Sequence, residues 1–173
     1  MKKLIGIIAI LTIIFIYGCS KQPSSIKAKQ DGKPLIVMYG DFKCPYCKKV
    51  EDKVMPKLRN KYIDKNKVKF QYVNLAFIGK DSIIGSRAQQ AVNHYAPKYS
   101  LQFQKLMFEH QKDEDKKWIT HTLIDKQIDK LNISNKTKDK IKTNYKTKNS
   151  TSWKAAEKDK KLGKEHHIKQ TPT

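Results

Sequence analysis

The sequence predicts an α/β protein that carries a redox-active pair of cysteines, and three observations support this prediction. An apolar run over residues 35–39 lies between Pro34 and Gly40, which indicates a buried strand. A Cys-Pro-Tyr-Cys motif over residues 44–47 comes shortly after it. Apolar residues then recur every four positions among charged ones, which predicts an amphipathic helix. The members of this repeat are Val50, Val54, Leu58 and Tyr62.

The length of 173 residues is enough for one domain with a sizeable core, and the N-terminal end predicts export from the cytoplasm. Lys2 and Lys3 precede an apolar run over residues 4–16, which is typical of a secretory signal. The run is shorter than the roughly 20 residues that a membrane-spanning helix needs. It leads into Tyr-Gly-Cys at residues 17–19, which resembles a bacterial lipobox. An uncleaved N-terminal anchor is the alternative.

We therefore expect a lipoprotein signal peptide over residues 1–18 and lipid, including palmitate, on Cys19. Residues 19–33 are polar and lack apolar periodicity, so we expect a tether between the lipid and the domain. The lipid-anchored and the uncleaved form both place the rest of the chain on the extracytoplasmic face of the cell membrane.

The next elements follow from the same kind of pattern. Pro45 falls in the first turn of the helix, where its missing N–H has no cost, and Pro56 is expected to kink the helix. Residues 67–73 alternate between apolar and polar side chains, which predicts a second strand. Its apolar character continues over residues 75–77.

Four helical stripes follow between residues 82 and 150, and no strand pattern interrupts them. The first is expected to end before Pro97, Ser134 is expected to cap the fourth, and a last helix is expected to start at Ser150 or Ser152. We interpret the stripes as packing surfaces. They are Ile83, Ile84, Ala88, Ala91, Val92 and Tyr95; Phe103, Leu106, Met107 and His110; Leu123, Ile124, Ile128 and Leu131; Ile141 and Tyr145; and, in the last helix, Trp153, Ala156 and Leu162.

The position of Cys44 at the start of a helix predicts its chemistry. Unpaired N–H groups and the positive end of the helix dipole stabilise a thiolate there, so we expect Cys44 to be an exposed nucleophile. Cys47, one turn further on, would be the resolving thiol. Lys43 and Lys48, taken as exposed, would add little positive potential. Weaker candidates for proton transfer are Asp41 and Glu51, which flank the motif.

Two other interpretations of the cysteine pair are weaker. A structural zinc site needs about four ligands, and the sequence has a single CxxC pair with His166 and His167 as possible partners. A structural disulfide across so short a loop stabilises little. The histidines at 94, 110, 121, 166 and 167 have no metal-ligand spacing, so we expect no metal and no cofactor.

The formal net charge of +21, from 37 Lys and Arg against 16 Asp and Glu, raises the possibility of an anionic partner. The lysines lie opposite apolar stripes, without aromatic interleaving or a nucleic-acid-binding motif. We therefore expect no nucleic acid and interpret the charge as a solvated surface. A non-specific attraction to anionic wall polymers is compatible with it.

Residues 39–47, Tyr-Gly-Asp-Phe-Lys-Cys-Pro-Tyr-Cys, resemble the start of a DsbA-family thiol–disulfide oxidoreductase, and in particular the lipid-anchored DsbA-like proteins of low-G+C Gram-positive bacteria. The resemblance extends over residues 34–173. It implies a thioredoxin-like fold with an inserted helical domain. The first part of the thioredoxin domain would cover residues 34–78, the insertion 79–149, and the second part 150–173.

The same resemblance implies roles for the C-terminal residues. Pro172 would be the cis-proline that faces the CxxC motif, and Thr171 would pair through its backbone with a substrate peptide. Tyr46, also expected at the substrate surface, replaces the histidine of the most oxidising members, so it supplies no cationic imidazole. The family fold continues with a β-hairpin and a last helix. We expect these to be missing and a product of this length to be unstable.

The function that these residues predict is the oxidation of cysteine pairs in exported proteins by Cys44 and Cys47, with an external electron acceptor for reoxidation. Two alternatives use the same residues. One is a disulfide reductase or isomerase, because the dipeptide between the cysteines does not decide the direction. The other is a non-catalytic, thioredoxin-like lipoprotein that binds peptides.

Overall fold

A computed structural model describes residues 29–173, so the predicted signal peptide, Cys19 and most of the predicted tether lie outside the described residues. Within the described part, no helix is long and apolar enough to cross a membrane. The strands are β1 Lys29–Gln30, β2 Lys33–Gly40 and β3 Lys69–Asn74. The helices are α1 Pro45–Lys53, α2 Met55–Leu58, the π-helical turn η1 Arg59–Ile63, α3 Ser82–Tyr95, the 3₁₀ turn η2 Pro97–Tyr99, α4 Ser100–Glu109, α5 His121–Asp129, α6 Asn135–Lys146 and α7 Thr151–Glu165.

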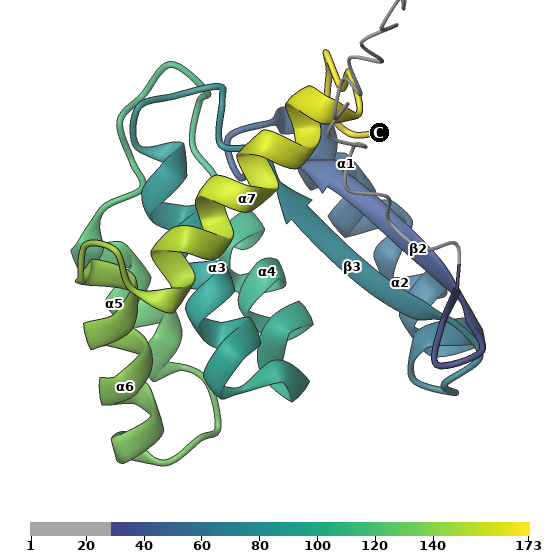
Figure 1. The fold of residues 1–173 in the computed structure, drawn as a ribbon, viewed down its shortest axis with the longest axis horizontal. Coiled ribbons are helices and arrows are strands. Elements are labelled where there is room, and N and C mark those ends of the chain that lie inside the picture. Colours follow the sequence, from purple (N-terminus) through teal and green to yellow (C-terminus); the bar gives the residue numbers. More distant parts are fainter. Residues whose placement is uncertain (1–28) are drawn as a thin grey trace, which may run out of the picture.

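The sheet lies between helices on both faces. β2 and β3 run parallel, with Leu35 opposite Lys69 and Gly40 opposite Asn74, and β1 pairs antiparallel with the start of β2. In Figure 1, α1 and α2 lie behind the sheet, while α7 lies in front of α3 and passes in front of the carboxyl ends of the strands. Helices α3 to α6 form a separate bundle beside the sheet (Figure 1). The carboxyl ends of the two parallel strands meet at the edge of the sheet where α1 begins.

The first predicted strand is confirmed and is longer than the apolar run, and the second is confirmed with a shifted end. β3 stops at Asn74, and the apolar residues that follow are not part of it. The Asn74 side chain accepts a hydrogen bond from the Ala76 N–H at 3.1 Å, and Ala76 has a positive φ of 49°. Leu75 and Ala76 are nevertheless buried, so their apolar character reflects packing in a turn.

The predicted kink near Pro56 is present as a turn at Val54, across which helical hydrogen bonds from Val54 N–H to the Val50 carbonyl and from Leu58 N–H to the Val54 carbonyl continue. α1 ends at Lys53, α2 starts at Met55 with Pro56 in its first turn, and the chain continues into η1. Proline is tolerated in a first turn because the N–H it lacks has no partner there. The other predicted helices are present, and no strand lies between residues 82 and 150 of the described chain. Ser134 and Ser150 cap α6 and α7 by accepting hydrogen bonds from Thr137 and Trp153 N–H.

Phe42 joins the sheet to the helical bundle. It is fully buried, and its ring lies 5.2 Å from that of Phe108 and 5.6 Å from that of Tyr72, between centroids. α3 passes so close that a Cβ on Gly85 would lie 2.8 Å from the Phe42 ring. A glycine is therefore required at this crossing. The same core cluster contains Cys44 and Cys47, so the cysteine motif is built into the contact between sheet and bundle.

Candidate active site

Cys44 occupies the N-cap position of α1. Its backbone is extended, with φ −71° and ψ 115°, and helical geometry begins at Pro45. The Cys44 sulfur accepts a hydrogen bond from the Cys47 N–H at 3.2 Å, which is the usual bond of an N-cap side chain to the third helical residue. The helix start therefore directs backbone N–H groups at this sulfur, as the sequence predicts.

The two thiols, both free, ionise very differently. The pKa of Cys44 is lowered from 9.0 to about 6, first by a hydrogen bond from the Cys47 side chain, then by hydrogen bonds from the Thr171 side chain and from the N–H groups of Cys47 and Tyr46, against the opposing effect of burial. The pKa of Cys47 is raised by its hydrogen bond to Cys44 and by burial. At neutral pH the pair thus carries a negative charge on Cys44 and a proton on Cys47.

The expectation that Cys44 is an exposed nucleophile is wrong. The residue is 3% exposed, and Cys47 is fully buried. Packing of the motif into the core between sheet and bundle covers most of Cys44. Tyr46, in contrast, is 62% exposed, and the Lys49 ammonium lies 4.8 Å from the centre of its ring. The outermost side chain of the motif is therefore the tyrosine.

Thr171 and Pro172 lie where the resemblance places them. The Thr171–Pro172 peptide bond is cis. The carbonyl oxygen of Thr171 lies 3.3 Å from the Cys44 sulfur, which donates to it when it is protonated. Thr173 exchanges two backbone hydrogen bonds with Tyr39 of β2, at 2.8 and 3.2 Å. This pairing fixes the end of the chain against the sheet and brings Thr171, 127 positions away in sequence, to the cysteine.

Asp41 organises the turn and is not free for proton transfer. Its carboxylate is fully buried and accepts four hydrogen bonds, from the N–H groups of Lys43, Phe77 and Ile78 and from the Ser82 hydroxyl. With these donors in place, the carboxylate ties the loop after β2 to the loop after β3. We assign it a structural role.

Glu51 is also engaged by partners. It is buried in α1, accepts hydrogen bonds from Arg59 at 2.6 Å and from Gln104 at 2.8 Å, and joins α1 to η1 and α4. Burial raises its pKa, and the positive charge of Arg59 acts in the opposite direction.

Three residues of the site were missed or misjudged from the sequence. Lys43 is 3% exposed, and its ammonium lies 3.0 Å from the buried carboxylate of Asp81. The Gln111 side chain donates hydrogen bonds to the backbone carbonyls of Phe42 and Cys44. No spacing signal links Asp81 or Gln111 to the motif, because both reach it from loops of the helical bundle. A lysine next to a reactive cysteine is normally expected in solvent, which is why Lys43 was misjudged.

The histidines have local roles. His166 shares a 2.8 Å hydrogen bond with the Tyr39 hydroxyl, and the His121 ring lies against Tyr145. His94 packs against Tyr95, and His110 contacts the Leu106 carbonyl. Over residues 29–173, no three His, Cys, Asp or Glu side chains are grouped closely enough to hold a metal ion.

Comparison with known proteins identifies the family. A family model described as thioredoxin matches residues 26–173. The disulfide bond formation protein D of Bacillus subtilis is 33% identical over 159 residues, which are 89% of this chain and 69% of the relative. The chain belongs to the DsbA-like thiol–disulfide oxidoreductases of the thioredoxin family. A probable disulfide bond formation protein D of Bacillus cereus is 38% identical over 96 residues, but the match spans less than half of that relative, 44%.

Solved structures support the assignment to this DsbA-like family. The crystal structure of oxidised BdbD from Bacillus subtilis matches with a TM-score of 0.72 and 32% identity, over 84% of this chain and 77% of that one. DsbA of Chlamydia trachomatis shares the fold, with a TM-score of 0.67 and 18% identity over 88% of this chain and 83% of that one. The predicted thioredoxin-like fold, with several helices beyond its core, is thus confirmed.

Proposed function

We propose that this DsbA-like protein is an extracytoplasmic, lipid-anchored thiol oxidase that introduces disulfides into exported cysteine-containing proteins. One observation carries the proposal. The Cys44 thiolate is stabilised at the N-terminus of α1, with a pKa of about 6, while its partner Cys47 keeps its proton. A stabilised thiolate favours the reduced protein and so makes its disulfide more oxidising.

The reaction follows from the arrangement of the two sulfurs. A substrate thiolate attacks the Cys44 sulfur of the Cys44–Cys47 disulfide, the S–S bond breaks, and its electron pair leaves on the Cys47 sulfur, which takes up a proton. A second substrate thiolate then attacks the substrate sulfur of the mixed disulfide and releases the Cys44 thiolate. The substrate gains a disulfide, and the protein becomes a dithiol. Two electrons and the Cys47 proton then pass from the Cys44 thiolate and the Cys47 thiol to an external acceptor, which restores the Cys44–Cys47 disulfide.

The environment of each sulfur suits its role. Cys44 is the better leaving group when the mixed disulfide is resolved, because its thiolate is the stabilised one. Cys47 is buried, and its raised pKa holds it as a neutral thiol after the first step. The Thr171 backbone lies beside the Cys44 sulfur and presents polar groups to which an extended substrate segment can pair.

The reduction potential of the Cys44–Cys47 couple tests the direction of the reaction. Equilibration of the full chain with glutathione buffers should give a potential nearer to the value of about −120 mV of a strong oxidant than to the value of about −270 mV of thioredoxin. Cys44→Ser, which cannot form the disulfide, is the control for the signal. A potential at or below that of thioredoxin would instead support the reductase.

The proposed location rests on residues 1–19, outside the described part of the chain. When the full chain is expressed in a Gram-positive host with radiolabelled palmitate, the label should appear on the protein in the membrane fraction. Cys19→Ala should abolish the labelling, and Cys44→Ser should leave it unchanged. Unlabelled native protein in the cytosolic fraction would overturn the lipid anchor without affecting the redox assignment.

A further inference from the structure

The loop over residues 110–120, between α4 and α5, lies against the turn that presents Cys44. From this loop the Gln111 side chain donates hydrogen bonds to the Phe42 carbonyl at 2.6 Å and to the Cys44 carbonyl at 3.0 Å. A carboxamide has two N–H donors, and these two carbonyls use both of them. Gln111 therefore bridges the two ends of the three-residue segment that leads into the motif.

The Cys44 carbonyl is also part of the helix start. It accepts the Lys48 N–H at 3.2 Å, and the sulfur of the same residue accepts the Cys47 N–H. Any movement of the Cys44 peptide group changes both bonds, because the side chain and the carbonyl are attached to the same Cα. Gln111 thus holds the backbone that aims the Cys44 sulfur at the N–H groups of α1.

A second link joins the same loop to the same turn. The buried Lys43 ammonium donates to Asp81 at 3.0 Å and to the Lys116 carbonyl at 2.9 Å. The other oxygen of Asp81 accepts the N–H groups of Trp118 and Ile119, at 3.0 and 2.9 Å. The loop is therefore fixed at its far end by an ion pair that includes the residue directly before Cys44. These bonds hold the loop against the turn and keep Gln111 within hydrogen-bond distance of its partners.

We propose that Gln111 is a positioning residue for the redox reaction, through which the helical bundle sets the thiolate character of Cys44. This inference rests on the proposed function, because it names a further determinant of the same cysteine pair. Gln111 acts in two ways. It holds the turn geometry, and the positive ends of its N–H dipoles lie beside the Cys44 carbonyl, where they favour a nearby negative charge.

Two substitutions separate these effects. Gln111→Leu removes the donors and leaves the two carbonyls without this partner. Gln111→Glu has nearly the same shape but directs carboxylate oxygens at the two carbonyls and adds a negative charge near the thiolate. We expect the Glu variant to raise the pKa of Cys44 more than the Leu variant does. Gln127→Leu is the matched control, because Gln127 is a buried amide of the same bundle that donates to the Leu123 carbonyl of its own helix.

The measurement is the pH dependence of Cys44 alkylation by iodoacetamide in the reduced full chain, followed by mass spectrometry of the Cys44 peptide, with urea unfolding of each variant in parallel. A rise of one pH unit in the midpoint lowers the thiolate fraction at pH 5 about tenfold. We expect a decrease of about tenfold in the alkylation rate at pH 5 for Gln111→Glu and about threefold for Gln111→Leu.

Each outcome decides a separate question. Unchanged midpoints in both Gln111 variants would overturn the inference and leave the proposed oxidase intact. An equal shift in Gln127→Leu would also overturn it, because the effect would then follow general loosening of the bundle. If Cys44 of the native chain were alkylated no faster than Cys47 below pH 7, the proposed function itself would fail.

Discussion

At the scale of single residues, the chemistry of Cys44 is set by residues of its own helical turn and by residues far away in the sequence. The sequence predicts a thiol at a helix N-terminus with a lowered pKa, and the structure confirms both. The largest cause of the lowered pKa, the hydrogen bond from the Cys47 side chain, depends on how the first helical turn closes. Thr171 was placed by family resemblance alone. Spacing within the motif cannot reveal Gln111 or Asp81, because their contacts with the turn depend on tertiary packing.

The side chain between the cysteines is the residue that separates this site from the most oxidising family members. Tyr46 is largely exposed and offers no cationic group to the thiolate. In Tyr46→His, an imidazolium beside the thiolate should lower the pKa of Cys44 further, by roughly half a unit because solvent screens an exposed charge. The iodoacetamide alkylation profile measures the change, with Tyr46→Phe as the uncharged control. An unchanged profile in Tyr46→His would show that the imidazolium does not reach the thiolate.

At the scale of helices and strands, periodic patterns predict that a helix or strand is present more reliably than they predict where it begins and ends. The amphipathic stripes identify α3 to α7, and two serine caps are confirmed at Ser134 and Ser150. The first helix is interrupted at Val54, and its apolar repeat predicts the buried face wrongly. Val54 and Tyr62 of the repeat are exposed, whereas Glu51 and Met55 are buried. The end of β3 is similarly decided by an asparagine side chain in a turn, which apolar character does not reveal.

Asp159 is a buried carboxyl group that joins α7 to α3 and that the redox reaction does not use. It is 7% exposed and accepts a hydrogen bond from Gln90 at 2.5 Å. Its pKa is raised from 3.8 to about 7, mainly by burial, while Gln90, the Asn74 backbone and Lys158 act in the opposite direction. Because the folded pKa is above the unfolded value, protonation of Asp159 favours the folded chain. This stabilisation is complete below about pH 4 and is lost as the pH rises towards 7.

We therefore expect Asp159→Asn to remove a pH dependence of folding. The difference in unfolding free energy between the variant and the native chain should move in favour of the variant by at most about 3 kcal/mol between pH 5 and pH 8. Urea unfolding at the two pH values measures it. Asp113→Asn makes the same chemical change at an exposed position and should give no such difference. A constant difference for Asp159→Asn at both pH values would contradict the raised pKa of this carboxyl.

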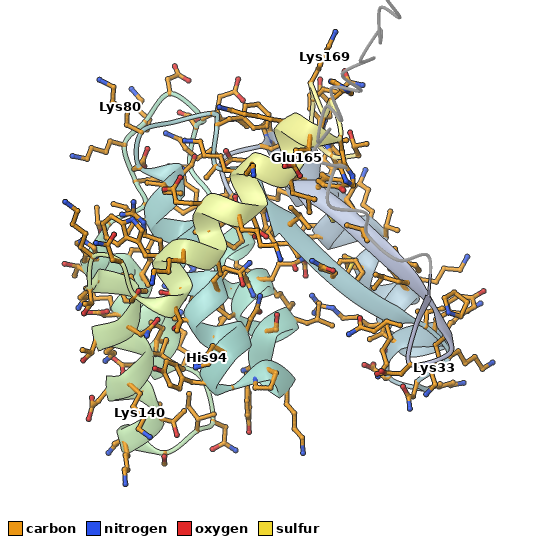
Figure 2. All side chains as sticks on the ribbon, viewed as in Figure 1. Lys33, Lys80, His94, Lys140, Glu165 and Lys169 are labelled. Atoms are coloured by element: carbon orange, nitrogen blue, oxygen red, sulfur yellow. The ribbon has the colours of Figure 1, made fainter. Side chains whose placement is uncertain are left out.

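At the scale of the whole molecule, the dominant property is a surplus of positive charge. The sequence has 37 basic and 16 acidic residues. Figure 2 shows long side chains projecting on all sides, with Lys33, Lys80, Lys140 and Lys169 at widely separated points of the surface. Among the described ion pairs, Lys43–Asp81 and Arg59–Glu51 are the most deeply buried, and the others involve at least one substantially exposed partner. Salt therefore acts mainly on the repulsion between surface lysines.

Salt changes the stability of the fold in two ways, through the ion pairs and through the repulsion between lysines, and the two changes have opposite signs. The larger of them decides whether the urea midpoint rises or falls. Exposed ion pairs contribute about 0–1 kcal/mol each and are weakened by salt, whereas the buried pairs are screened much less. Self-repulsion in a chain with a net charge of +21 destabilises the compact state, and salt relieves it. We expect the relief to be larger, so the urea midpoint should rise when NaCl is increased from 10 to about 150 mM, where the Debye length falls to about 8 Å.

Most of this rise should be complete by about 150 mM, because further salt then screens little at the distances between surface lysines. A gradual, linear increase that continues to 1 M would instead indicate salt exclusion from the surface, which does not depend on net charge. Acetylation of the lysines under native conditions supplies the control, because it removes the positive charges and should remove the steep early rise. A urea midpoint that decreases as NaCl is raised from 10 to 150 mM would show that the surface ion pairs stabilise the fold by more than the repulsion between lysines destabilises it.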